Sequence, residues 1–520
     1  MDIEERKEDL ECPNLGIERK YDEIFVQVKK LLVLAGPLML VNILLYSLQV
    51  ISVMFVGHQG ELALSGASMA TSFAFVTGFA LLMGMGSALE TLCGQSYGAN
   101  QYHMLGIHMQ RAMFVNLLVS IPLACIWANA GRILVILRQD PEIAAEAGIY
   151  ARFMIPSIFA YGLLECQIRF LQAQNNVVPM MLTAGGTALL HVFGCWILVL
   201  KSGLGSRGAA LANATSYWIN VLSLVAYIKI SPSFKSTWTG FSTEAFSDIP
   251  RYLRLAIPSA LMICLEIWSF EMMVLLSGLL PNPKLETSVL SISLNTSAMV
   301  HMLPQGLGGA TSVRVSNELG AGRPKTARLV AHTATILATT EGILVAIVMV
   351  SISKVWGHCY SNEKEIVKYV GKMCFFLAGS HFLDAHQSIF SGIARGCGWQ
   401  KIGAYVNLGA FYLWGIPIGI LLAFVYHVGG KGLWLGIILA ISAQAVIYSV
   451  VILRTNWDEQ AKKAAVRCLI GHGLQRNSKN HIHIVKMISI MSIGHRRELA
   501  LFSASLATFF AIIRFFDLCD

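Results

Sequence analysis

Charged residues are scarce in this chain. Asp, Glu, Lys and Arg make up 13% of its 520 residues, whereas soluble domains usually carry about 25%. Hydrophobic residues reach 55%, more apolar surface than a soluble core of this length could enclose, while a lipid bilayer leaves no need to enclose it. The shortage of charge therefore excludes a soluble protein and predicts an all-α polytopic membrane protein.

Several local patterns are also absent. The eleven cysteines include no C-x-x-C pair, and most lie inside apolar segments, so we expect neither a disulfide nor a zinc framework. No G-x-x-x-x-G-K-[ST] loop is present, so the chain lacks an ATP-binding motif and ion-driven chemistry is favoured. The first 30 residues are mixed and acidic, without a signal-peptide pattern before the first apolar segment.

Apolar segments long enough to cross a bilayer recur along the whole chain. We expect twelve membrane spans, at residues 31–57, 64–90, 107–128, 147–170, 177–200, 208–229, 253–280, 287–311, 327–353, 370–393, 401–425 and 431–453. Lys and Arg near both ends of the chain predict cytosolic termini by the positive-inside rule. The net charge of +9 is spread over short loops, so no nucleic-acid partner is expected.

The longest polar interruption between spans falls midway along the chain. We expect a cytosolic N-terminal tail at 1–30, a first lobe at 31–230, a cytosolic inter-lobe loop at 231–252, a second lobe at 253–455 and a C-terminal tail at 456–520, atypical after 467. An apolar run at 499–513 is shorter than a comfortable span. An interfacial or poorly ordered tail is therefore favoured over a thirteenth membrane helix.

The second half of the chain repeats the pattern of the first. Pro37 and Pro258 each open an apolar segment, and Gly98-Ala and Gly320-Ala each end the following one. A repeat of hydrophobic segments in the same direction is typical of membrane transporters. It predicts twelve transmembrane helices in two pseudo-symmetric six-helix lobes around a central cavity. Because both prolines lie within their spans, we expect them to act as hinges.

Acidic side chains within spans are costly, so each needs a partner, a proton or a cavity. Glu266 lies in the middle of the seventh span and Asp384 in the middle of the tenth. Two neighbouring carboxyls removed from water can hold a proton on the acidic side of a membrane and release it to a neutral cytosol. We predict a proton relay at this pair, with a purely structural role as the alternative. Glu271 lies about 140° around the helix from Glu266 and cannot face the same site.

Other polar and aromatic residues within spans are candidates for lining a cavity. Glu165 lies four residues before Arg169, a spacing that favours a helical ion pair. Glu90, near the end of the second span, either lines the cytosolic half of a cavity or faces polar neighbours. The further candidates for a cavity lining are Asn42, Asn295, Trp268 and Phe382.

A metal site at His381, Asp384 and His386 is not expected. Positions 384 and 386 lie about 160° apart on a helix, so three ligands on one helix cannot converge there. A membrane-embedded metal-dependent enzyme, the alternative from a different class, therefore lacks a converging ligand set.

Several motifs resemble the plant branch of the MATE (multidrug and toxic compound extrusion) transporters, the DETOXIFICATION proteins. The resemblance covers about residues 30–467. It is carried by Ala35-Gly-Pro37, Met54-Phe-Val-Gly57-His, Leu62-Ala-Leu-Ser-Gly-Ala-Ser-Met-Ala, Glu90-Thr-Leu-Cys-Gly-Gln-Ser-Tyr-Gly98-Ala and Arg395-Gly-Cys-Gly-Trp-Gln-Lys401. A major-facilitator carrier, which also has twelve helices, is the alternative, but its G-x-x-x-D-R-x-G-R-R loop after helix 2 is absent.

The resemblance implies an antiporter, not an enzyme, that exports organic solutes from the cytosol in exchange for a cation, with no cofactor. Glu266 and Asp384 match the family's coupling residues of helices 7 and 10. Some prokaryotic relatives carry an essential Asp in helix 1, where this chain has no acidic residue and Asn42 is the nearest polar group. We expect protons rather than sodium as the coupling ion, a monomer, and a location in the plasma membrane or the vacuolar membrane.

Overall fold

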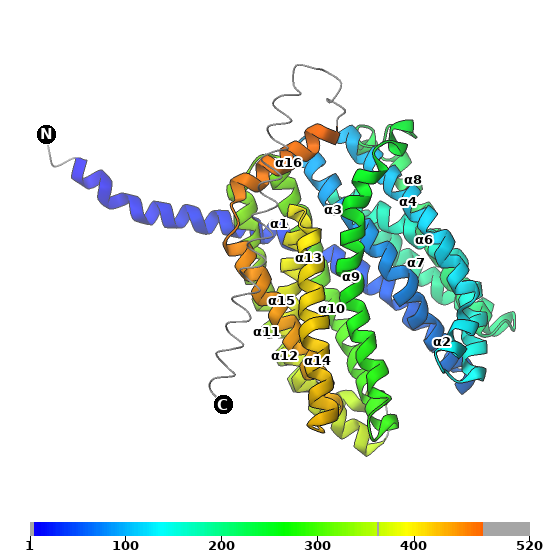
Figure 1. Ribbon diagram of the computed structural model, residues 1–520. Coiled ribbons are helices and arrows are strands. Elements are labelled where there is room, and N and C mark those ends of the chain that lie inside the picture. The colour runs from blue at the N-terminus through cyan, green and yellow to red at the C-terminus, as the bar shows by residue number, and fades with distance from the viewer. Residues whose placement is uncertain (1–4, 361–362, 472–520) are drawn as a thin grey trace.

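The computed structural model describes residues 5–360 and 363–471, and every regular element in this part is a helix (Figure 1). The six long segments of the first half are α1 (Glu5–Gly57), α2–η1–α3 (Glu61–Ala74, Phe75–Phe79 and Ala80–Gly98), α4 (Tyr102–Ala128), α6 (Pro141–Ala173), α7–η2 (Val178–Cys195 and Trp196–Lys201) and α8 (Ser206–Ile230). The short helix α5 (Ala130–Ile136) joins α4 to α6.

The second half has the same organisation. Its six long segments are α9 (Ile249–Ser277), α10 (Pro283–Gly320), α11 (Pro324–Trp356), α12 (Lys364–Cys397), α13–η6–α14–η7 (Gln400–Asn407, Leu408–Gly415, Ile416–Ile420 and Leu421–Val425) and α15 (Gly430–Leu453). Short turns η3 (Pro232–Phe234) and η4 (Thr243–Phe246) lie between the halves, and η5 (Gly357–Cys359) follows α11. The expected twelve helical segments are thus confirmed within the described residues.

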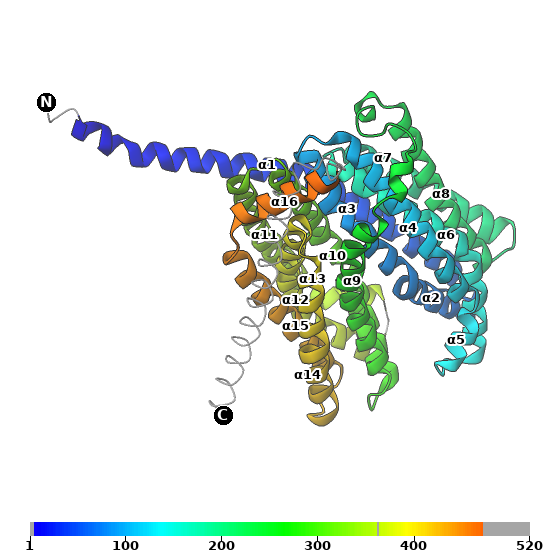
Figure 2. The same ribbon diagram turned by 45° about the horizontal axis from the view of Figure 1, so that its top comes forward.

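Most of these helices extend beyond the expected spans, because their polar ends continue the helix outside the apolar stretch. At the start of α6, Asp140 accepts hydrogen bonds from the backbone N–H groups of Glu142 and Ile143 at 2.9 and 3.1 Å. Such an N-cap satisfies donors that the first turn leaves free. Helix α1 begins at Glu5, so residues 5–30, expected as a separate tail, continue the first span as one helix, which projects beyond the bundle (Figures 1 and 2).

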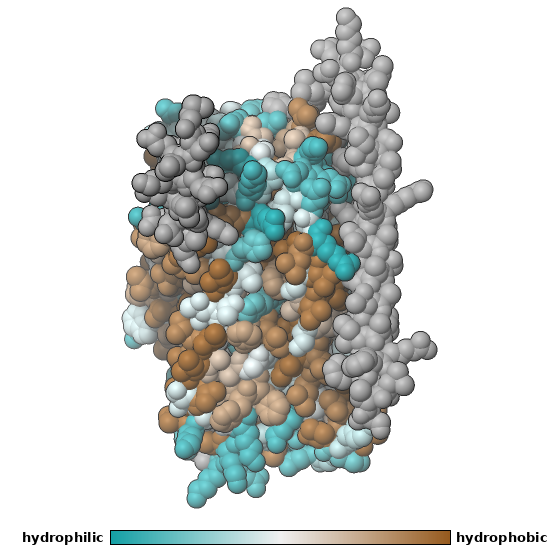
Figure 3. Space-filling model, turned by 90° about the vertical axis from the view of Figure 1, so that its left-hand side faces the viewer, coloured by the Kyte–Doolittle hydropathy of each residue, from teal (hydrophilic) through white to brown (hydrophobic). Residues whose placement is uncertain are grey.

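Ten of the twelve segments are long and apolar enough to cross a membrane. On the face shown in Figure 3, a broad apolar band separates polar surfaces at the two ends. Helices α10 and α12 are not among the ten, although they have 38 and 34 residues. Their sequences are more polar because they carry many buried Ser, Thr, His and Asn side chains. These two helices lie inside the bundle and contribute to the candidate site described below.

The lobes meet along α3, α9 and α10, and along α1 and α10. The contact is reciprocal. A Cβ atom added to Gly98 would collide with the backbone oxygen of Asn317, and one added to Gly320 would collide with that of Gln95. Gln95 and Asn317 occupy equivalent positions in the two repeats, so the interface has the self-complementary form of a two-fold contact. The repeated glycines therefore allow the two lobes to approach closely.

Helix α16 (Trp457–Gly471) packs across one end of the bundle, against α3, α10 and α11. Arg467 donates to the backbone oxygen of Cys397 at 2.8 Å and lies 3.3 Å from Oε1 of Gln95, so it contacts both lobes. Trp399 donates from Nε1 to Gln460 at 3.1 Å and fixes the first turn of α16.

The apolar run at 499–513 lies outside the described residues.

Candidate functional site

The predicted carboxyls of the second lobe lie in one polar region of the bundle. Oε2 of Glu266, on α9, accepts a hydrogen bond from Nε2 of Gln387 at 2.9 Å and lies 3.5 Å from Nδ2 of Asn407. Glu266 and Asp384 are close enough for their charges to interact. Asp384 and Gln387 are three residues apart on α12, so they share one face of that helix.

A chain of amide groups holds the Asn407 side chain in place beside Glu266. Asn407 donates to the backbone oxygen of Met262 on α9 at 2.6 Å and accepts from Nε2 of Gln444 on α15 at 2.7 Å. Both amides are fully buried. Since buried polar groups need partners, this chain fixes which Asn407 atom faces the carboxylate, and it directs an N–H group toward Glu266.

A histidine that the sequence analysis did not single out contacts the second carboxyl. Nδ1 of His301, on α10, lies 2.6 Å from Oδ2 of Asp384. A further pair lies on the same side of α12, where Nε2 of His381 is 3.0 Å from Oε1 of Glu341 on α11. Glu341 is an acidic residue in the middle of the ninth span, so the same argument that selected Glu266 could have found it.

His381, Asp384 and His386, for which no shared metal site is expected, each contact a different partner. His381 pairs with Glu341 and Asp384 with His301, while Nε2 of His386 lies 2.9 Å from Oγ1 of Thr339. Over residues 5–360 and 363–471, no cluster of three or more His, Cys, Asp or Glu side chains has a geometry that could hold a metal ion.

The remaining candidates for the cavity lining and the hinges lie in different parts of the bundle. Trp268 donates from its indole N–H to the backbone oxygen of Val76 at 3.1 Å, a contact between the lobes. The ring of Phe382 packs against His386, with 4.7 Å between the ring centres. Asn42 is half-buried on α1 and Asn295 is exposed on α10. Pro37 and Pro258 lie within continuous helices, α1 and α9.

Glu90 does not line an open space. Its side chain is 1% exposed and lies between two arginines, with Oε1 2.9 Å from Arg169 of its own lobe and Oε2 2.8 Å from Arg395 of the second lobe. Of its two predicted roles, the structure favours the polar-neighbour alternative over the cavity lining. The predicted pair of Glu165 and Arg169 is confirmed at 3.2 Å.

Glu271 faces away from the second-lobe carboxyls, as predicted. Its Oε2 accepts from Oγ of Ser72 on α2 at 3.1 Å, a contact with the first lobe. Glu266 and Glu271, five residues apart on α9, therefore have different surroundings.

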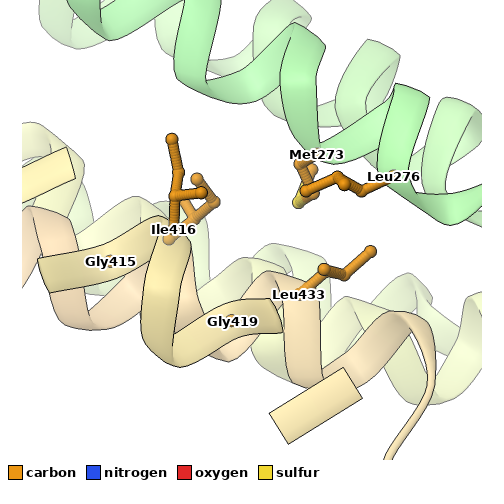
Figure 4. A pocket seen from close by; sticks show the side chains of 7 residues that line it. Met273, Leu276, Gly415, Ile416, Gly419 and Leu433 are labelled. Carbon is orange, nitrogen blue, oxygen red and sulfur yellow. The ribbon is translucent and has the colours of Figure 1, made fainter. Parts of the chain in front are cut away.

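A small pocket in the second lobe has a different character. Met273 and Leu276 of α9 face Ile416 and Leu433 across it, and Gly415, Gly419 and Ile437 complete its lining (Figure 4). All of these residues are apolar, so the pocket offers no hydrogen-bonding side chain, and it contains none of the predicted site residues.

Two repeated six-helix lobes, with ionisable side chains buried in the middle of their helices, define a membrane transporter. The MatE family model matches residues 37–197 and 258–421, together more than half of the sequence, and the chain belongs to this family. The matched segments begin at Pro37 and Pro258, the two residues that open the repeats. The match excludes the major-facilitator and enzyme alternatives.

Relatives and solved structures support the same assignment. Protein DETOXIFICATION 16 of Arabidopsis thaliana is 60% identical over 466 residues, 90% of this chain and 95% of that protein. DETOXIFICATION 17 is 58% identical over 85% of this chain and 93% of its own length. The crystal structure of the eukaryotic MATE transporter AtDTX14 superposes with a TM-score of 0.84 at 46% identity, covering 86% of this chain and 100% of that one. The protein is thus an integral membrane transporter with the MATE fold.

Proposed function

We propose that this protein is a secondary active antiporter that exports organic compounds from the cytosol in exchange for protons. The substrates are xenobiotics or secondary metabolites of cationic or amphipathic character. Relatives that are 58–60% identical carry the name DETOXIFICATION, which supports the export of such compounds. The observation that carries the proposal is the grouping of Glu266, Asp384 and His301 from three helices of one lobe.

Protons entering from the acidic side neutralise Glu266 and Asp384 in this mechanism. Oε2 of Glu266 accepts N–H donors from Gln387 and Asn407, and Oδ2 of Asp384 is hydrogen-bonded to Nδ1 of His301. Neutralising a carboxylate weakens charge-assisted hydrogen bonds of this kind. The loosened contacts let α9 and α10 bend near Pro258, so that the second-lobe side of the central cavity shrinks and substrate is released outward.

The proton gradient is large enough for this task. One charge moved through 100 mV contributes about 2.3 kcal/mol, and one pH unit adds about 1.4 kcal/mol. For a neutral substrate exchanged for one proton, the total supports a concentration ratio above about one hundred. For a monovalent cation the electrical contributions cancel, and the pH gradient alone drives export about tenfold per pH unit.

The units that move are the first lobe at 31–230 and the second lobe at 253–455, joined by the cytosolic loop at 231–252. The chain acts as a monomer in the plasma membrane or the vacuolar membrane, with acidic apoplast or vacuolar lumen on the far side. A proton is preferred over sodium because the contacts of Oε2 of Glu266 and Oδ2 of Asp384 are to nitrogen atoms of Gln387 and His301 rather than to further oxygen ligands.

Uptake into inside-out vesicles with an acidic lumen tests the proposal, with fluorescent organic cations as substrates. We expect Glu266→Gln and Asp384→Asn to lower proton-driven uptake at least tenfold. Glu271→Gln is the matched control, since it changes the same residue type on the same helix away from the pair, and it should retain uptake. Full proton-driven uptake by both site variants would refute the coupling mechanism.

A further inference from the structure

His301 is more exposed than Asp384, the residue whose carboxyl it contacts. Its side chain is 26% exposed and that of Asp384 is 10% exposed, with 2.6 Å between Nδ1 and Oδ2. An imidazole has a second nitrogen, Nε2, on the opposite edge of the ring. The ring can therefore take up a proton at one edge while its other edge contacts the carboxylate.

Three of the helices packed against α10 contribute a carboxyl group near His301. Asp384 from α12, Glu266 from α9 and Glu341 from α11 all act electrostatically on the imidazole. His381 of α12 acts on Asp384 and is itself paired with Glu341. The site thus contains three carboxyls and two imidazoles, in which the three acidic charges face a cation formed on His301.

This arrangement differs from what a metal cation requires. Hard cations are bound by several oxygen atoms from carboxylates, carbonyls or water. Here the Asp384 oxygen nearest α10 faces a ring nitrogen, and Oε2 of Glu266 faces the amides of Gln387 and Asn407. An N–H donor supplies no lone pair to a metal, so these donors favour protonation over metal binding.

We propose that His301 is a specificity-determining residue for the coupling ion, and that the driving proton is shared between His301 and Asp384. A hydronium ion on the acidic side transfers its proton to the ring: one O–H bond breaks, one N–H bond forms and a water molecule leaves. The resulting imidazolium neutralises the charge of the Asp384 carboxylate that it contacts. The pair then titrates as one unit, and the ring keeps sodium away from the carboxylate. This inference rests on the proposed proton antiport.

The test uses purified full-length protein in liposomes, with substrate uptake and lumenal pH followed together by a pH-sensitive dye. In wild type, a pH gradient drives uptake and a sodium gradient of the same size does not. We expect His301→Asn, which keeps a side-chain N–H donor but cannot titrate, to lower proton-driven uptake at least tenfold and to flatten its pH profile. Substrate affinity without a gradient should stay within threefold.

His386→Asn is the matched control, because His386 is a half-buried histidine of α12 bonded to Thr339 and outside the pair. It should keep the wild-type pH profile. A variant that fails to fold is recognised by lost substrate affinity, and His301→Gln then serves as the second variant. An unchanged pH profile in a folded His301 variant overturns the inference and leaves proton antiport standing. Wild-type uptake driven by sodium and not by protons overturns both.

Discussion

Glu90 of the first lobe and Arg395 of the second lobe form a buried ion pair, with 2.8 Å between Oε2 and Nε. The two residues are 305 positions apart in the chain. Around them, Thr91 donates to the backbone oxygen of Arg395, and Nε2 of Gln95 donates to that of Gly396 at 3.0 Å. This group of contacts joins the lobes at the predicted cytosolic end.

Removing either member of this pair should destabilise the protein strongly. Glu90→Gln leaves two arginines facing one another, and Arg395→Gln leaves a buried carboxylate with one arginine fewer. Breaking a buried pair costs about 3–5 kcal/mol. We expect a clear drop in melting temperature in detergent for each variant, and a double variant less destabilised than the sum of the two.

The control for this pair is Arg251→Gln, which removes an arginine that is 41% exposed and lies 3.0 Å from Asp248, itself 47% exposed. Exposed pairs contribute about 0–1 kcal/mol, so this melting temperature should barely move. Additive effects of the Glu90 and Arg395 changes would show that the ion pair does not hold the lobes together.

Asn407→Leu should destabilise the second lobe as well as the Glu266 environment. The substitution leaves the N–H group of the buried Gln444 amide without its acceptor, and a buried unsatisfied group costs about 1–3 kcal/mol. Thermal unfolding in detergent measures the effect. Asn295→Leu, at an exposed position of α10, should leave the melting temperature within a degree or two, and equal effects of the two substitutions would contradict the buried amide chain.

Gly84→Ala and Gly186→Ala should change stability in opposite directions. A Cβ atom at position 84 would lie 2.5 Å from Cα of Ala260 in the other lobe, whereas one at position 186 meets nothing within 4 Å. Overpacking typically costs about 1–3 kcal/mol, while Ala is favoured over Gly in a helix by about 0.5–1 kcal/mol. Melting temperatures of the two variants provide the comparison, and a stabilised Gly84→Ala protein would show that the lobes are further apart.

Maleimide labelling of Cys468 should be slow at neutral pH and should increase with pH. Burial of this α16 thiol raises its pKa to about 11, compared with about 8.5 for a free thiol. Because only the thiolate reacts, we expect labelling about a hundredfold or more slower than for a free thiol near pH 7.5, increasing about tenfold per pH unit up to pH 9. Peptide mass spectrometry assigns the label, and denatured protein serves as the fully reactive reference. Rapid labelling of the folded protein at pH 7 would mean that α16 does not cover this thiol.

The sequence predicts the repeat, the twelve helical segments and the family, because bilayer thickness and hydropathy leave a strong pattern. It also selects Glu266 and Asp384, because an acidic side chain in the middle of a span is conspicuous. His301 is not conspicuous by that rule, since a neutral imidazole in a span carries no charge. Its partner Asp384 is 83 positions away, and no local spacing rule connects residues on different helices.

The ion pair between lobes illustrates the same limit. Glu90 and Arg395 each lie near a helix end, where charged residues are ordinary, so neither predicts the other. The expected spans are also shorter than the helices, because capping residues such as Asp140 extend a helix beyond its apolar stretch. Hydropathy alone cannot locate a polar first turn of this kind.

Helix α12 runs from Lys364 to Cys397 as one continuous helix, without a proline. It carries Asp384 in its middle and Arg395 eleven residues further on, about 16 Å along the axis at 1.5 Å per residue. Because the helix is continuous, a shift along its axis or a rotation at Asp384 also moves Arg395. In the proposed mechanism, a movement of α12 that follows protonation of Asp384 therefore also reaches Arg395 and its contact with Glu90 of the first lobe.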